Sequence, residues 1–369
     1  MPVCESSRES DLSFASFEGP AIVGVAAAVP QRVLDNLEFD WDFSDQEVRD
    51  IVAKSGVQRR RWAPDSICGS DMSEAAAKRL LQDMDVDPQS VDAVVFVSQT
   101  PDYRMPATAA LLQHRLALGT GAAAFDINLG CSGYVYGLFV AFSMIGSGAM
   151  RRVLLLNGET RTRAYSFRDR KTGLLFGDAG TATLIEHRPT AGKSHFSLNS
   201  DGERGHLISI KAGGARHPST PETLREKAQP DGGFRSDEHG VMDGVGIFSF
   251  MISDVYRDIR AILERAGRGA DELAFAVMHQ ANRFGLEHLR KKLGLAPDQV
   301  PYSLDEFGNT SSASIPLTMV TRLADKLPLM GGDVLLSGFG VGLSWASAVL
   351  RLDRPHVSGL VEMPDPIDA

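Results

Sequence analysis

The chain has 369 residues, a formal net charge of −9 at pH 7 and a hydrophobic fraction of 43%. This composition indicates a globular α/β protein long enough for two core-sized units, and its acidic balance argues against general affinity for nucleic acid or anionic membranes. No run approaches ~18 consecutive apolar residues, so no membrane insertion is expected. The three cysteines, Cys4, Cys68 and Cys131, have no metal-ligand or disulfide pattern, which favours a reducing, cytoplasmic location.

The first half of the chain alternates apolar runs of strand length with stretches of helical periodicity. Residues 1–18 are polar and acidic, lack the apolar segment of a secretory signal, and are predicted to form a mobile tail. Beyond this tail we predict strands at 21–29, 91–98, 122–127 and 153–157, and helices at 44–54, 71–84, 107–118 and 134–145. The apolar strand at 91–98 is expected to be covered on both faces.

The turn Gly130-Cys131-Ser132-Gly133 joins a predicted strand to a predicted helix. A cysteine at a helix start lies near unpaired N–H groups and the positive end of the helix dipole, which we expect to lower the pKa of the thiol. The resulting thiolate attacks thioesters. Considered alone, the same pattern fits a buried structural cysteine equally well.

The second half repeats the order of the first. Segment 273–280 corresponds to 91–99, 300–312 to 122–133, 333–340 to 152–159, and 342–350 to 178–186. Two units related by an approximate two-fold axis would bring their equivalent turns to one central site. Cys131, His279 and Asn309 would then converge. The segment 211–240 is rich in glycine, proline and charge and is predicted to be an exposed lid or entrance loop.

His279 alone is more often a satisfied histidine at a strand end, and Asn309 alone is more often a turn or cap residue. Their positions at corresponding turns of a repeated unit favour a shared function.

Together these motifs resemble the thiolase superfamily, and within it β-ketoacyl-acyl carrier protein synthase III. The resemblance extends from about residue 21 to 352 and is carried by GVQRRR, TPDYRMPATA, AAAFDINLGCSGYVYGL, DRKTGLLFGDAGTATLIE, HQAN, GNTSSAS and GFGVGLSWAS. It implies a homodimer with a duplicated, five-layer αβαβα fold and pseudo-two-fold symmetry. The halves would span 19–188 and 189–355, followed by a C-terminal tail at 356–369.

The resemblance also implies the chemistry. Cys131 would accept an acyl group from a thioester, with its own backbone N–H and that of Val341 holding the oxyanion. His279 and Asn309 would stabilise the enolate formed when malonyl-acyl carrier protein loses carbon dioxide. Formation of the β-ketoacyl product would require no metal and no cofactor. Segment 337–344 contains no second catalytic cysteine of the thiolase type.

The acyl donor is less well defined by the resemblance, and it could be carrier-borne or bound to coenzyme A. Arg170 matches an arginine that holds the nucleotide end of coenzyme A, and Lys54 and Arg59 are candidate phosphate contacts. Asp50, however, stands where the family commonly has a tryptophan that stacks on adenine. Met105 stands where a phenylalanine usually enters the partner subunit's acyl pocket.

A positive patch after HQAN is the predicted docking site for an acidic carrier protein. It comprises Arg283, Arg290, Lys291 and Lys292, for which a solvated helix end with cations near its C-terminus is the alternative.

Two other functions remain open. The first is acyl transfer to an alcohol or amine without decarboxylation, which the presence of Asn309 disfavours. The second is a non-catalytic partner subunit in a heterodimer, which the presence of Cys131 disfavours.

Overall fold

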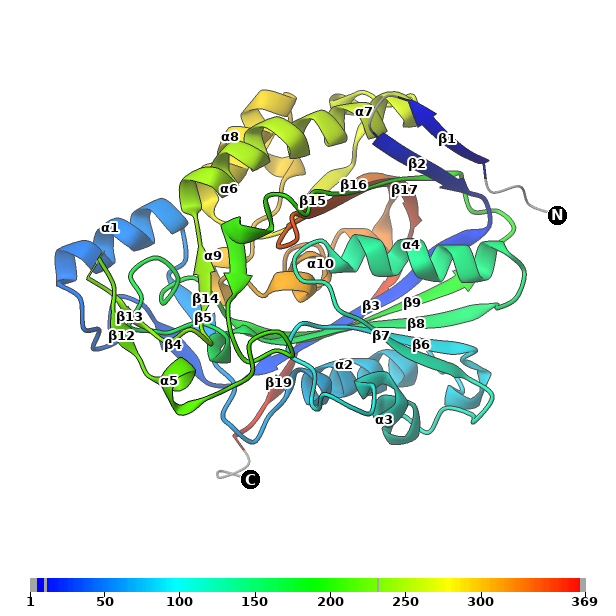
Figure 1. Ribbon diagram of the computed structural model, residues 1–369. Coiled ribbons are helices and arrows are strands. Elements are labelled where there is room, and N and C mark those ends of the chain that lie inside the picture. The colour runs from blue at the N-terminus through cyan, green and yellow to red at the C-terminus, as the bar shows by residue number, and fades with distance from the viewer. Residues whose placement is uncertain (1–4, 10–11, 231, 366–369) are drawn as a thin grey trace.

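The computed structural model describes residues 5–9, 12–230 and 232–365, in which two sheets alternate with three layers of helices (Figure 1). The seven-stranded sheet has the order β18 (His356–Val357), β3 (Pro20–Pro30), β9 (Asp178–His187), β8 (Arg152–Thr160), β6 (Ala93–Val97) and β7 (Ala123–Ile127), and β19 (Val361–Met363) also pairs with β3. The six-stranded sheet has the order β1 (Glu5–Glu9), β2 (Leu12–Phe17), β10 (Ser194–Ser200), β17 (Ser344–Asp353), β16 (Gly331–Gly340) and β15 (Phe275–Met278).

Helices α4 (Gly133–Gly146) and α10 (Ser314–Arg322) form the layer between the sheets (Figure 1). Helix α4 is apolar on nearly all sides because both sheets cover it. The outer layers are α2 (Gly69–Asp83) with α3 (Thr108–Arg115) on one side, and α7 (Tyr256–Ala266) with α8 (Arg283–Leu293) on the other. The prediction of a five-layer αβαβα fold is therefore confirmed.

The duplication is visible in the strand order. Strands β3, β9, β8 and β6 of one sheet correspond to β10, β17, β16 and β15 of the other. Within each of these sets of four strands, the first two pairs are antiparallel and the third pair is parallel. The correspondence of 300–312 with 122–133 holds only for the turn, because residues 300–303 form no strand beside β15 that would match β7. The first half therefore has one strand more at this edge.

The mobile tail predicted for 1–18 is wrong where the chain forms β1 and β2. Strand β2 pairs with β10, and Phe14 and Phe17 on it are buried. Phe14 packs into one core cluster and Ala15 and Phe17 into another, so β2 contributes buried side chains on both of its faces. At the other end, β18 and β19 attach 356–363 to β3. The remaining tail residues 1–4, 10–11 and 366–369 lie outside the described residues.

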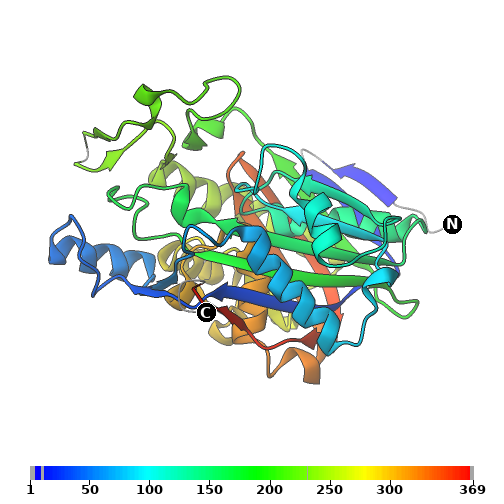
Figure 2. The ribbon, with the colours of Figure 1, turned by 90° about the horizontal axis from the view of Figure 1, so that it is seen from below.

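Smaller elements surround the two sheets. Helix α1 (Asp45–Ser55) projects from the body (Figure 2), with Ser44 and Glu47 forming a capping box at its start. Beside it, β4 (Val33–Asp35) pairs with β5 (Arg59–Arg61). Helix α6 (Gly244–Phe250) leads through a π-helical turn, Met251–Val255, into α7. Helix α9 (Leu304–Phe307) directly precedes Gly308-Asn309, the second glycine turn, which corresponds to Gly130-Cys131 in the first half.

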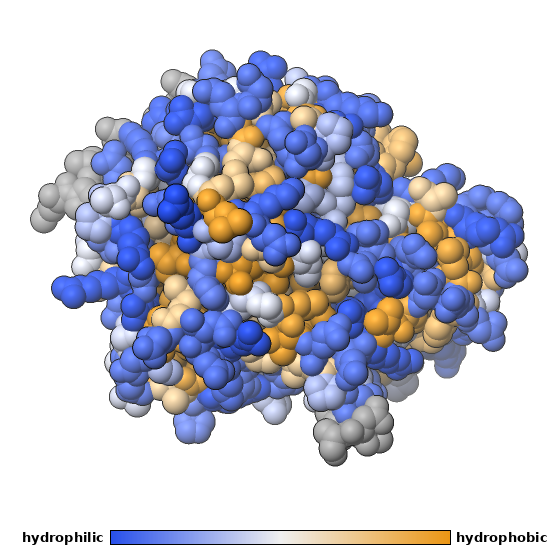
Figure 3. All heavy atoms as spheres, turned by 180° about the vertical axis from the view of Figure 1, so that it is seen from behind, coloured by the Kyte–Doolittle hydropathy of each residue, from blue (hydrophilic) through white to orange (hydrophobic). Residues whose placement is uncertain are grey.

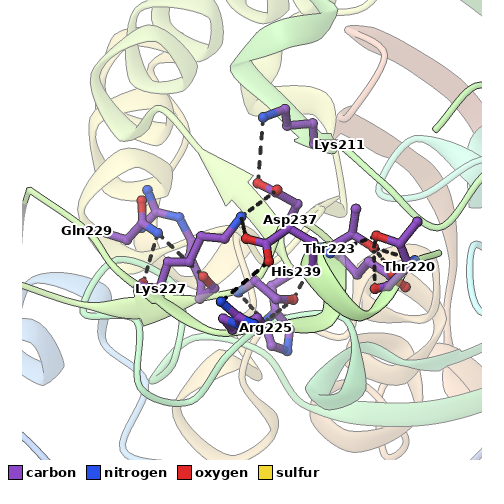
Figure 4. Close-up of polar contacts among 12 residues, drawn as sticks. Lys211, Thr220, Thr223, Arg225, Lys227, Gln229, Asp237 and His239 are labelled. Carbon is purple, nitrogen blue, oxygen red and sulfur yellow. Dashed lines mark hydrogen bonds and ion pairs between the residues drawn. The ribbon is translucent and has the colours of Figure 1, made fainter. Parts of the chain in front are cut away.

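The segment 211–240 runs from the end of β11 (Ile208–Ile210) to the first residue of β14 (Gly240–Met242), and these two strands pair with each other. It contains α5 (Pro221–Leu224) and the hairpin β12 (Lys227–Ala228) and β13 (Phe234–Arg235). Figure 4 shows its charges paired with one another, with Asp237 between Lys211 and Lys227 at 3.6 and 3.2 Å. As predicted, most of its described residues are exposed.

Figure 3 shows a face covered mostly by hydrophilic residues, with hydrophobic residues in patches between them. Within the described residues, no helix has the length and apolar character needed to cross a membrane.

Candidate active site

Cys131 lies immediately before Ser132, the N-cap of α4. The preceding strand β7 and the helix are joined tightly because the N–H of Gly133 donates to the carbonyl of Gly130 at 2.7 Å. Cys131 is buried, with 9% of its surface exposed. Its Sγ lies 3.8 Å from the hydroxyl of Ser311, a residue of the second half.

The end of β16 packs directly against the cysteine turn. A side chain at Gly340 would place its Cβ 2.8 Å from the Cβ and 3.0 Å from the Sγ of Cys131. A Cβ at Gly338 would lie 2.7 Å from the Cys131 carbonyl oxygen. Only glycine allows this close approach, which brings the next residue, Val341, to the edge of the same cavity.

His279 follows β15 and is almost completely buried. Its Nδ1 lies 2.8 Å from the hydroxyl of Ser314 at the start of α10, and its backbone N–H donates to the carbonyl of Ser337. The ring also packs edge-on against Phe339 with centroids 5.6 Å apart. These contacts fix the imidazole through Nδ1, and the backbone of Ser311 also hydrogen-bonds to the ring.

Asn309 occupies the second glycine turn. Its Oδ1 accepts the N–H of Ser311 at 2.9 Å, and its backbone N–H donates to the carbonyl of Leu175 at 2.8 Å. Ser311 has a positive φ of 54°, a conformation that costs energy for a residue with a side chain. This bond fixes the orientation of the amide, and its nitrogen Nδ2 is the group that can donate to a ligand.

All three predicted residues line one central cavity, which is small. Its volume is about 70 Å³, on a scale where one water needs about 10–15 Å³. The structure therefore brings Cys131, His279 and Asn309 together, as the repeated turns predicted. The other lining residues are Arg161, Tyr165, Leu175, Phe176, Ile208, Met242, Gly244, Ile247, Phe248, Met251, Ala281, Asn282, Phe339, Gly340 and Val341.

Burial dominates the electrostatics of this cavity. Burial raises the pKa of the Cys131 thiol, while the nearby charge of Arg161 and the Ser311 hydroxyl act in the opposite direction. The expectation of a lowered thiol pKa is therefore wrong, because desolvation outweighs these groups. Burial also lowers the pKa of His279 to about 3, so the imidazole is neutral at physiological pH.

The sequence pattern did not reveal two charged residues at the end of β8 and directly after it. Glu159 and Arg161 are both buried, and Arg161 lines the central cavity with Tyr165, whose hydroxyl accepts a hydrogen bond from Arg161 Nη2 at 3.0 Å. Glu159 accepts from the Gln99 N–H and the Thr100 hydroxyl. A signal existed, since 152–159 corresponds to 333–340, the segment that ends against Cys131.

The residues predicted to hold the donor lie outside the central cavity. Lys54 and Asp50 are exposed on α1, Arg59 pairs with Glu306 at 3.4 Å, and Arg170 pairs with Glu47 at 3.2 Å. Arg60, the residue next to Arg59, cannot serve as a phosphate contact at the surface. It is buried and donates to Asn36 and to the carbonyl of Phe176, so it supports the cavity wall.

The predicted docking residues on α8 differ in their environments. Arg283 is 46% exposed and stacks over Tyr302, and Lys291 is exposed. The Arg290 side chain is only 12% exposed and binds Glu287 and the carbonyl of Leu295, whereas Lys292 donates to the carbonyl of Ile252. Arg290 thus stabilises the helix end, the alternative that the sequence left open for this patch, although its side chain is largely buried there.

Met105 is 85% exposed and does not line the central cavity of its own chain.

Comparison with known proteins adds an independent line of information. The family models described as 3-oxoacyl-[acyl-carrier-protein (ACP)] synthase III and as its C-terminal region match residues 125–202 and 263–352. A β-ketoacyl-[acyl-carrier-protein] synthase III of Roseiflexus castenholzii is 38% identical over 90% of this chain and 97% of its own length. A corresponding protein of Caldanaerobacter subterraneus is 34% identical over 90% and 98%. The crystal structure of a 3-oxoacyl-(acyl-carrier protein) synthase from Burkholderia xenovorans has a TM-score of 0.90 and 39% identity, covering 96% of this chain and 100% of that one.

Proposed function

Because the chain belongs to the β-ketoacyl-acyl carrier protein synthase III family, we propose that Cys131, His279 and Asn309 carry out a decarboxylative condensation. An acyl group from a thioester is joined to the two-carbon unit of malonyl-acyl carrier protein. The observation that carries this proposal is that a nucleophile and two neutral hydrogen-bond donors line one small cavity.

The first step transfers the acyl group to Cys131. The thiolate attacks the thioester carbonyl carbon, the C–S bond to the donor breaks, and the departing thiolate takes up the proton that Cys131 lost. Backbone N–H groups of Cys131 and Val341 hold the oxyanion in between. This assignment is supported by the close packing of the 338–341 backbone against the cysteine turn.

The second step forms the carbon–carbon bond. The malonyl thioester loses carbon dioxide, and its electron pair becomes an enolate whose oxygen accepts hydrogen bonds from His279 Nε2–H and Asn309 Nδ2–H. The enolate carbon attacks the acyl-Cys131 carbonyl, and the Cys131 thiolate leaves. Neutral donors suit this role because they stabilise the developing charge without first retaining the substrate carboxylate.

Intact-mass measurement and release of labelled carbon dioxide test the proposal together. Incubation with a short acyl thioester is expected to add one acyl group to the wild-type chain and none to Cys131→Ala. Carbon dioxide should then appear only when malonyl-acyl carrier protein is added. An adduct without carbon dioxide release would indicate transfer to an alcohol or amine. A chain that forms no adduct would fit a non-catalytic subunit.

The carrier protein is proposed to dock at the start of α8. Arg283 directly follows Asn282, a residue of the cavity lining, so a carrier bound there could insert its thioester arm between 281–282 and 244–248. Charge reversal of Arg283 and Lys291 should raise the Michaelis constant for malonyl-acyl carrier protein in a salt-dependent way. Arg257→Glu, a reversal on α7, is the control, and an unchanged constant in the double variant would exclude this docking site.

For the donor, we propose that coenzyme A thioesters bind weakly and that a carrier-borne acyl group is the physiological primer. Exposed Asp50 replaces an aromatic platform, and the cations Arg59 and Arg170 are already paired with carboxylates. Competition between the same acyl group on coenzyme A and on carrier protein, scored as acylated Cys131, tests this. Preference for coenzyme A at micromolar concentration would contradict it.

A homodimer is proposed from the edge strand β7. Its five residues are only half-buried although four are apolar, and the exposed Met105 lies in the segment between β6 and α3. A second copy could cover this edge and receive Met105 in its acyl pocket. Light scattering should give twice the chain mass, and a monomer at micromolar concentration would refute the proposal.

Cys131 must stay reduced to act as a nucleophile, which supports a cytosolic location.

A further inference from the structure

Arg161 is an unusual residue to find in the wall of an acyl cavity. It lies at the end of β8, only 5% of its surface is exposed, and among the described lining residues it is the one with a permanently charged side chain. The remaining lining is mostly aromatic and aliphatic. Placing a guanidinium in such surroundings is costly unless its charge and its N–H groups find partners.

The partners present do not satisfy this guanidinium. Its hydrogen bond within the described residues is Nη2 to the Tyr165 hydroxyl at 3.0 Å, out of five N–H donors. The group also lies over the rings of Tyr165 and Phe176, at 5.1 and 5.6 Å from their centroids. Its Nε is buried and has no hydrogen-bond partner in the described part of the chain. No carboxylate oxygen of the described residues comes within 4.0 Å of it.

Glu159 is the nearest candidate for a counter-ion on the same segment, but its carboxylate is used elsewhere. Both oxygens accept hydrogen bonds from neighbouring donors, namely the N–H of Gln99 and the hydroxyls of Thr100 and Ser312. The charge of Glu159 therefore moderates that of Arg161 from a distance without occupying its donors.

A buried guanidinium with unused donors beside a thioester-reactive cysteine is suited to bind a carboxylate, whose two oxygens match its planar N–H groups. Resting on the proposed function, we propose that Arg161 recognises the distal carboxylate of a short dicarboxylic acyl primer as that primer is loaded onto Cys131. The small cavity limits the primer to a few carbon atoms between the thioester and the carboxylate. A purely aliphatic primer would leave the guanidinium donors unsatisfied.

Three N-acetylcysteamine thioesters of similar length test this inference, because they avoid the separate question of the donor. Glutaryl carries the carboxylate, glutaramoyl is its neutral amide, and hexanoyl is aliphatic. The readout is the initial rate of Cys131 acylation by intact mass. The wild-type chain should prefer glutaryl over both others by about tenfold to a hundredfold, the scale of a hydrogen bond to a buried charged group.

Arg161→Met preserves most of the side-chain volume and should abolish or invert this preference, whereas Arg161→Lys should retain part of it. Arg163→Met is the matched control, because Arg163 is exposed and donates to the carbonyls of Pro64 and Ile67. It should leave the preference unchanged. Thermal unfolding of each variant verifies the fold, and the ratio of rates within one variant is independent of its active fraction.

Several results would overturn the inference. A wild-type preference for hexanoyl would do so while leaving the proposed condensation intact, whereas acylation by none of the thioesters would refute the proposed function itself. If Arg161→Met slowed all three thioesters equally, Arg161 would be an activator of the thiol. A last possible result concerns enzyme already loaded with hexanoyl. If Arg161→Met raised only its Michaelis constant for malonyl-acyl carrier protein, Arg161 would recognise the carboxylate of the malonyl group instead of that of the primer.

Discussion

Strands β8 and β16 occupy equivalent positions in the two halves, and both end beside the active site. Their ends differ, because charged side chains lie at the end of β8 and directly after it, whereas β16 ends with glycine. The N–H of Asp92 donates to the Arg152 carbonyl and that of Ala274 to the Asp333 carbonyl, which aligns the two strands. The seventh residue beyond each is Glu159 in one half and Gly340 in the other. Each packs against the glycine turn of the opposite half, Glu159 against Ser312 and Gly340 against Cys131.

At the end of β16, Gly338 and Gly340 have no side chains, which makes space for the thiol and exposes the backbone. At the end of β8, by contrast, side chains bring charge to the cavity wall. The duplication therefore supplied one scaffold, and the halves then diverged at the positions that meet the substrate. We infer a division of labour in which the first half provides the nucleophile and selects the primer. The second half provides the donors for decarboxylation.

The largest effects should separate the two halves cleanly. Cys131→Ala is expected to abolish acylation. His279→Ala and Asn309→Ala should leave acylation within a few-fold of wild type and slow carbon dioxide release by about 100-fold or more, the scale of losing one oxyanion donor. Intact mass measures the first step and labelled carbon dioxide the second. Equal loss of both steps in the His279 or Asn309 variants would contradict the division of labour.

A smaller effect is expected from adding one methyl group at Gly340. The new Cβ would lie 2.8 Å from Cys131 Cβ, and Gly340→Ala should therefore cost about 1–3 kcal/mol of stability and displace the thiol. Urea unfolding and the acylation rate are the measurements. Gly121→Ala is the matched control, because no atom of the described residues lies within 4 Å of the position that its added methyl group would take. Equal stability of the two variants would show that β16 does not restrain the cysteine turn.

Much of this arrangement could be predicted from the sequence because repeated motifs mark repeated positions. Cys131 and His279 each follow an apolar run, and Asn309 was found because Gly308-Asn309 corresponds to Gly130-Cys131. Arg161 could not be assigned, because periodicity does not show which way side chains point once a strand has ended. For the same reason Arg59 and Arg60 look alike in sequence, although one is exposed and the other is buried. Arg290 was misjudged because its partners depend on how α8 ends.

Stability should show the cost of burying His279. Its folded-state pKa of about 3 lies below the ordinary value of 6.5, so between these values the unfolded chain binds a proton that the folded chain does not. Stability is therefore lost as pH falls from 6.5, by up to about 1.4 kcal/mol per pH unit. Asp258, whose pKa is raised to about 6, acts in the opposite direction between 3.8 and 6. Urea unfolding of wild type and His279→Asn isolates the His279 contribution as their difference, and parallel curves would contradict it.

The smallest effect is expected for the pH dependence of the second step. Enzyme already acylated on Cys131 no longer titrates its thiol, so carbon dioxide release from malonyl-acyl carrier protein then reports on the second half. With a His279 pKa of about 3 the imidazole is neutral above pH 5.5, and the rate should stay level to pH 8. A histidine with the ordinary pKa would instead be about nine-tenths protonated at pH 5.5. Acylation of the free enzyme should meanwhile rise by about tenfold per pH unit while the thiol remains largely protonated, because burial raises its pKa. A midpoint near 6.5 in the condensation of pre-acylated enzyme would show that His279 changes charge during turnover.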